Sequence, residues 1–211
     1  MRTIAENINA IKAKISSLNK TTELIAVSKN HDANAVLEAI NTGQYLFGEN
    51  RVQEATSKFT NVKNQFPQVK LHLIGPLQTN KVKDALALFD VIQTLDREKL
   101  ANEFAKHKTN MEFFIQVNIG EEPQKAGIAP NQAEEFYKFC TADLKLNVTG
   151  LMCIPPVDVD PVPFFKQLIN LKSKIGNLKL SMGMSADYEQ AAQLGADYVR
   201  IGTAIFGTRS N

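Results

Sequence analysis

Short segments that are apolar on both faces alternate with amphipathic segments along the chain of 211 residues. The first such segment, residues 23–28, reads Glu-Leu-Ile-Ala-Val-Ser, which is typical of a parallel strand buried on both sides. Seven more strand-like segments follow, and helix-like segments separate them. These strand-like segments are 45–48, 71–74, 91–93, 112–118, 147–152, 178–182 and 197–201. Regular alternation of this kind predicts a parallel α/β fold.

The length of the chain favours a closed barrel over an open sheet. Eight units of about 25 residues lie near the lower end of the range for a (β/α)8 barrel. No GxGxxG motif follows the first strand, so the dinucleotide-binding fingerprint is missing. A stripe of isoleucines and leucine over 4–18 predicts a helix ahead of the first strand. We therefore predict a single (β/α)8 TIM barrel with an additional N-terminal helix, forming one domain over residues 1–211.

Composition excludes several classes of partner. Twenty-four Lys and Arg residues against 22 Asp and Glu give a net charge of +2, spread along the chain, which predicts no nucleic-acid binding. No apolar run approaches the roughly 18 residues that cross a membrane, and no signal peptide is visible at the N-terminus. Cys140 and Cys153 form no CxxC motif and have no histidine at ligand spacing, so we expect buried, reduced thiols and no metal site. The interpretation is a cytoplasmic protein, without a membrane partner, that we expect to be a monomer.

Lys29 is the first candidate functional residue. In barrels of this type the active face lies at the carboxyl ends of the strands. Lys29 follows the first strand on the parity of Ile25 and Val27, so its amine is predicted to project into the barrel mouth. A partly desolvated lysine there becomes a nucleophile that forms a Schiff base with an aldehyde. The alternative is a lysine that only extends to solvent at the rim.

The loops after the last two strands are the usual phosphate site of this architecture. In this chain they contain two glycines and two hydroxyl residues, which are Gly183, Ser185, Gly202 and Thr203. Glycine permits close approach of the backbone to a ligand, and hydroxyl groups add hydrogen-bond donors. The alternative is that Ser185 only caps its helix and that the glycines only turn the chain.

Arg200 completes the pattern. It shares its parity with Tyr198, which predicts a guanidinium that points into the barrel. The alternative is an internal ion pair with Glu49 or Asp187. We call the glycine and hydroxyl residues of the last two loops the phosphate cup. This cup, together with a lysine at the end of the first strand and an inward arginine, is typical of a pyridoxal phosphate site.

Six segments in one order across nearly the whole chain resemble the pyridoxal phosphate homeostasis proteins, a family built like the N-terminal barrel domain of bacterial alanine racemases. The segments are 26–29, 47–54, 72–81, 150–152, 181–187 and 200–207. The resemblance implies that Lys29 holds pyridoxal 5′-phosphate as an aldimine and that Ser185, Gly202 and Thr203 hold its phosphate. It also implies that Arg200 faces the pyridine nitrogen and that Asn50 lines the pocket. Residues 30–32, Asn-His-Asp, depart from the Thr/Gly-Lys/Arg-Pro run that is more common in relatives.

The resemblance further implies a role in intracellular pyridoxal phosphate homeostasis, as a carrier or regulator without an established catalytic activity. Pyridoxal phosphate-dependent apoenzymes are the implied protein partners. Independently, an arginine opposite the ring nitrogen disfavours its protonation and makes the ring a weak electron sink. We also expect no second domain to supply the opposing tyrosine of the racemases. Two alternatives stay open: a pyridoxal phosphate-dependent racemase or lyase of low activity, and a barrel enzyme for a phosphorylated sugar or nucleotide in which Lys29 is only a cation.

Other polar residues invite competing interpretations. His72 lies within a strand, and we expect a hydrogen-bonded residue that fills the barrel rather than a metal ligand. Glu121 and Glu122 stand in a loop and are expected to face water. Lys81 and Lys125 are rival amines for an aldehyde, but no strand positions either of them.

Overall fold

The computed structural model describes residues 2–207, and within them eight parallel strands close into a barrel in the order β1 to β8. The strands are β1 (Glu23–Val27), β2 (Leu46–Glu49), β3 (Lys70–Leu73), β4 (Val91–Leu95), β5 (Glu112–Val117), β6 (Val148–Cys153), β7 (Lys179–Ser181) and β8 (Tyr198–Ile201). The barrel closes where β1 pairs with β8, with Leu24 opposite Val199 and Ala26 opposite Ile201. The predicted (β/α)8 barrel is therefore confirmed.

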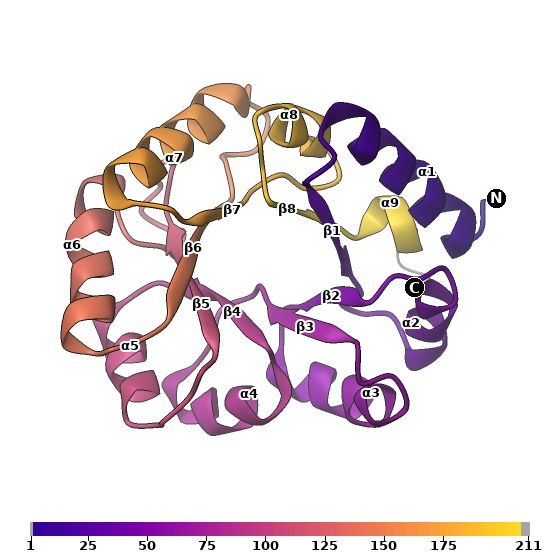
Figure 1. Ribbon diagram of the computed structural model, residues 1–211, viewed down its shortest axis with the longest axis horizontal. Helices are drawn as coiled ribbons and strands as arrows, with labels where there is room; N and C mark the ends of the chain where they lie inside the picture. The colour runs from indigo at the N-terminus through magenta and orange to yellow at the C-terminus, as the bar shows by residue number, and fades with distance from the viewer. Residues whose placement is uncertain (1, 208–211) are drawn as a thin grey trace.

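Helices surround the ring of strands (Figure 1). They are α1 (Ile4–Leu18), α2 (Ala33–Ile40), α3 (Val52–Gln65), α4 (Val82–Leu88), α5 (Glu98–Ala105), α6 (Ala133–Lys138), α7 (Val162–Ile175), α8 (Tyr188–Gln193) and α9 (Thr203–Phe206). The additional N-terminal helix is α1, which begins at a capping box: Glu6 N donates to the Thr3 hydroxyl, and Thr3 N donates to the Glu6 carboxylate. Within residues 2–207, no helix is both long and apolar enough to traverse a membrane.

Some element boundaries differ from the prediction. The sequence pattern of residues 131–140 predicts a single helix, but the structure divides this region into η2 (Pro130–Gln132), α6 and the π-helical η3 (Phe139–Asp143). The pattern of residues 79–88 likewise predicts one helix, which in the structure begins as the 3-10 turn η1 (Thr79–Lys81) and continues as α4. Helix α9 was not predicted, because four residues are too few to show a helical period.

The strands separate two apolar layers. Leu24 and Ala26 of β1 belong to the main core between barrel and helices, whereas Ile25 belongs to a second buried cluster. That cluster also contains Val91, Phe114, Met152 and Tyr198. Because its members come from five strands around the ring, the cluster fills the barrel interior. The inner face of β1 therefore has the parity of Ile25, which is also the parity of Lys29.

Both cysteines are free and buried, as predicted. Burial raises the pKa of the Cys140 thiol and of the Cys153 thiol to about 12. Neither thiol is therefore a reactive nucleophile in the folded protein.

Candidate functional site

A cavity of about 770 Å³ lies at the carboxyl ends of the strands. All six residues predicted to hold a cofactor line it: Lys29, Asn50, Ser185, Arg200, Gly202 and Thr203. They come from the ends of β1, β2, β7 and β8, so residues far apart in sequence meet because the barrel closes. Sequence reasoning did not identify other lining residues, among them His31, Ile74, Ile154, Met184 and Ala186.

Lys29 lies two residues beyond the end of β1, in the turn before α2. The expected desolvation of its amine is wrong, because this turn places the side chain at the exposed rim of the cavity. The next residue, Asn30, adopts a φ of 62°, a left-handed conformation that asparagine tolerates better than most residues. The backbone N–H of Asn30 donates to the carboxylate of Glu54 in α3, which ties the turn to that helix.

A buried ionic cluster supports this turn from behind. Lys58 of α3 donates through Nζ to Glu49 Oε1 at 2.8 Å and to the carbonyl oxygen of Ser28 at 2.7 Å. The Ser28 hydroxyl also donates to Glu49 Oε1, at 2.7 Å. Burial raises the pKa of Glu49, although Lys58 and Ser28 oppose that shift. Glu49 is therefore the partner of Lys58, and the alternative in which it pairs with Arg200 is wrong.

Arg200 points into the barrel, the orientation indicated by its parity with Tyr198. It is 3% exposed, and its Nη2 donates to the carbonyl oxygen of Cys153 at 2.8 Å. No carboxylate of residues 2–207 lies within ion-pair distance of its guanidinium. Burial lowers the pKa of Arg200, and Cys153 and Asp187 oppose this shift. The site thus contains a buried positive charge that no side chain of the described protein neutralises.

The loop after β7 is closed by its own hydrogen bonds. Met184 N donates to Asp187 Oδ1 at 2.6 Å, and Tyr188 N donates to the carbonyl oxygen of Met184 at 2.8 Å. Asp187 is the residue before α8, so the alternative in which Ser185 only caps that helix is wrong. Ser185 and Ala186, between the bonded residues, line the cavity.

Two glycines of the predicted phosphate cup have different surroundings. Gly202 lines the cavity and precedes α9, and a Cβ at this position would lie 3.1 Å from the carbonyl oxygen of Val27. Gly183 does not line the cavity. It has a φ of +91°, and a Cβ there would lie 2.5 Å from the Cβ of Ala191, so Gly183 serves the packing of the loop against α8.

His31 is a lining residue that no motif indicated. Its ring stacks on Phe206 of α9, with ring centroids 5.0 Å apart. Partial burial and the nearby Lys58 amine lower the pKa of His31. The contact joins the first loop of the barrel to its last helix.

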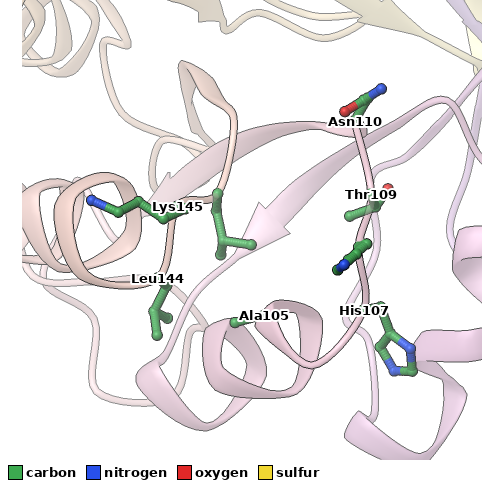
Figure 2. A pocket seen from close by; sticks show the side chains of 8 residues that line it. Ala105, His107, Thr109, Asn110, Leu144 and Lys145 are labelled. Atoms are coloured by element: carbon green, nitrogen blue, oxygen red, sulfur yellow. The ribbon is translucent and has the colours of Figure 1, made fainter.

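A second cavity of about 470 Å³ lies at the opposite end of the barrel, beside the segments that precede β5 and β6. Figure 2 shows that its polar side chains diverge: Lys145, Asn110 and His107 point in different directions. The rival amines lie outside the first cavity, with Lys81 Nζ 3.5 Å from Asp84 and Lys125 Nζ 2.6 Å from Glu122. The first cavity is therefore the better candidate site.

Comparison with known proteins identifies the family. The family model described as "Alanine racemase, N-terminal domain" matches residues 1–210. The pyridoxal phosphate homeostasis protein of Vibrio cholerae is 39% identical, over 99% of this chain and 98% of that protein. The chain belongs to the pyridoxal phosphate homeostasis protein family. The resemblance inferred from six segments is thus confirmed.

Solved structures agree with this family assignment. PipY of Synechococcus elongatus has a TM-score of 0.87 at 34% identity in a structure without PLP, and 0.83 at 33% in one with PLP bound. Each match covers 97% of this chain and 100% of PipY. Alanine racemase from E. faecalis has a TM-score of 0.76 at 15% identity, with 98% of this chain covering 58% of that one, which shows a shared fold.

Proposed function

We propose that this chain binds pyridoxal 5′-phosphate in the cavity at the carboxyl ends of its strands and acts in homeostasis of that cofactor, as a carrier or regulator. The observation that carries the proposal is that one cavity collects Lys29, Arg200 and the loops after β7 and β8. The names of its relatives and the PLP bound in PipY support the same ligand.

The residues around the cavity fit this ligand in charge and in shape. Arg200 supplies a buried positive charge, and Lys29 supplies an accessible primary amine. The absence of a side chain at Gly202 leaves space that a Cβ would narrow against Val27. An anionic phosphate, an aldehyde and an aromatic ring nitrogen each have a complementary group in this set.

The bound group would supply an aldehyde that condenses with a primary amine. We assign Lys29 Nζ as that amine and Asn50 as part of the cavity wall. Ser185, Gly202 and Thr203 are assigned to the phosphate, through hydroxyl groups and backbone N–H groups. Arg200 is assigned to the ring nitrogen, where its positive charge makes protonation of that nitrogen unfavourable. This favours a carrier or regulator over an enzyme that stabilises carbanions.

The test is covalent labelling of the purified protein. Incubation with pyridoxal phosphate is expected to produce a near-visible absorbance, and borohydride reduction is expected to fix the label on the peptide that contains Lys29. Lys29→Ala should lose both signals. Lys81→Ala is the matched control, because that amine lies outside the cavity and pairs with Asp84. A label that remains in Lys29→Ala, on Lys81 or Lys125, would overturn the site assignment.

A second measurement separates a carrier from an enzyme. A carrier or regulator should cause no exchange of amino-acid α-protons with solvent deuterium, whereas a racemase or lyase would do so for at least one amino acid of a panel. Mixing the loaded protein with a pyridoxal phosphate-dependent apoenzyme tests the predicted partners through recovery of that enzyme's activity. The monomeric state and the cytoplasmic location stay predictions.

A further inference from the structure

A chain of four buried polar side chains crosses the interior of the barrel from β8 to β3. Arg200 Nη1 donates to Ser181 Oγ at 2.8 Å, and Ser181 Oγ donates to Gln93 Oε1 at 2.7 Å. Gln93 Nε2 lies 2.8 Å from His72 Nδ1. Ser181 and Gln93 are fully buried, and His72 is 2% exposed. The chain connects the arginine of the site with a histidine on a strand that does not neighbour β8.

The chemistry of Arg200 sets the direction of every hydrogen bond in this chain. A guanidinium only donates, so Ser181 Oγ accepts from it and directs its own proton to Gln93. The amide oxygen of Gln93 then accepts, which leaves the amide nitrogen to donate to His72 Nδ1. His72 must therefore be neutral and carry its proton on Nε2. All protons of the chain point from the arginine towards the histidine.

The surroundings of His72 agree with this role. Burial, together with the Lys70 and Lys179 amines, lowers the pKa of His72 to about 3. The ring of Tyr198 packs edge-on against it, with centroids 5.5 Å apart. A neutral imidazole in this position retains the lone pair that accepts from Gln93.

We propose that Ser181 and Gln93 are positioning residues that fix the guanidinium of Arg200 at the cofactor site through this one-way chain of hydrogen bonds. Because Arg200 has no carboxylate partner within residues 2–207, its orientation depends on Ser181 Oγ and the carbonyl oxygen of Cys153. Ser181 in turn is held by Gln93. The inference rests on the proposed function, since it assumes that Arg200 faces the ring of pyridoxal phosphate.

The first test uses the protein without cofactor. Nitrogen-15 NMR of labelled histidine should show His72 as the neutral Nε2–H tautomer at pH 6. Gln93→Met, which retains the volume but has no amide, should shift the Nδ1 resonance because that nitrogen loses its donor. Finding His72 as the Nδ1–H tautomer in the unmodified protein would overturn the proposal, because Nδ1 would then donate and the chain would run the other way.

The second test uses the protein loaded with pyridoxal phosphate. Ser181→Ala removes the hydroxyl that contacts Arg200 and should weaken cofactor binding by about tenfold, the usual effect of losing a hydrogen bond to a charged group. The midpoint of the pH titration of the near-visible absorbance should rise, because a loosely held arginine opposes protonation of the ring nitrogen less effectively. Gln93→Met should shift the midpoint in the same direction by a smaller amount, since it acts through Ser181.

Thr94→Val is the matched control. Thr94 neighbours Gln93 on β4, is 1% exposed, and its hydroxyl has no hydrogen-bond partner among residues 2–207. The substitution retains the shape and should leave affinity and titration midpoint unchanged. Unchanged midpoints in both Ser181→Ala and Gln93→Met, or an equal shift in Thr94→Val, would overturn the positioning role. Failure of the unmodified protein to bind pyridoxal phosphate would instead refute the proposed function. The NMR test alone would then decide whether the hydrogen bonds run from Arg200 to His72.

Discussion

Replacing Lys58 by methionine tests whether the buried ionic cluster behind the first loop stabilises the fold. The substitution preserves most of the side-chain length and removes the amine that contacts Glu49 Oε1 at 2.8 Å and Ser28 O at 2.7 Å. Glu49 is fully buried and would lose its bonded cation. Breaking one partner of a buried ion pair costs about 3–5 kcal/mol. At about 2–4 °C per kcal/mol for a domain of this size, Tm should fall by roughly 10 °C.

Urea unfolding at pH 8 and pH 5 measures this cost. Without Lys58, the pKa of Glu49 in the folded state should rise further above its unfolded value. A carboxyl group whose pKa is raised in the folded state stabilises that state below its unfolded pKa, and this stabilisation is lost as the pH increases. The loss of unfolding free energy in Lys58→Met should therefore be smaller at pH 5 than at pH 8. The same variant should bind pyridoxal phosphate more weakly, because Lys58 holds the carbonyl oxygen of the residue before Lys29.

Lys138→Met is the control for the effect of burial. Lys138 Nζ lies 2.7 Å from Glu134 Oε1, a distance similar to that between Lys58 and Glu49. The side chains of the control pair are 67% and 47% exposed, against 5% and 0% in the buried pair. An exposed pair of this kind contributes at most about 0.5 kcal/mol. Equal losses of unfolding free energy in Lys58→Met and Lys138→Met would refute the argument that desolvation makes the Lys58 cluster costly to break.

Three further predictions follow from buried groups. The pKa of His72 is lowered to about 3 in the folded state, so below about pH 6.5 the unfolded state binds a proton that the folded state does not. The free energy of unfolding of the unmodified protein, measured with urea, should therefore fall by about 2 kcal/mol between pH 7 and pH 5. His72→Gln should not show this fall. Gly75→Ala should weaken cofactor binding in a titration of the near-visible absorbance. A Cβ at this position would lie 2.4 Å from the carbonyl oxygen of Asn50 and would displace that cavity residue. Unchanged binding would contradict the assignment of Asn50 to the cavity wall. Cys140 and Cys153 should react with a thiol reagent at the rate of unfolding, and fast labelling at neutral pH would contradict their burial.

The fold was predictable because the alternation of strand and helix patterns leaves few architectures for a chain of this length. The N-terminal helix was predicted over its observed range, since an apolar stripe from Ile4 to Leu18 defines its buried face. Strand β4 was predicted to end at Gln93, yet it continues to Leu95. The polar Thr94 hid this extension, because its burial does not follow from its residue type.

The candidate site was predictable to the extent that topology decides it. The ends of parallel strands meet at one face of a barrel, so Lys29, Arg200 and Thr203 could be placed together without knowing any distance. The partners of the buried groups could not be predicted. Lys58 reaches Glu49 from a neighbouring helix, and Gln93 reaches Ser181 across the barrel, so neither contact follows a spacing in the sequence.

The pairing of the first strand with the last also determines when the cavity forms during synthesis. Lys29 follows β1, whereas Arg200, Gly202 and Thr203 lie in or after β8, so Lys29 leaves the ribosome well before these residues. A nascent chain that has not yet reached β8 therefore has Lys29 but lacks the residues that we propose to hold the phosphate. Under the proposed assignment, tight capture of the vitamin-derived ligand requires that translation has passed β8.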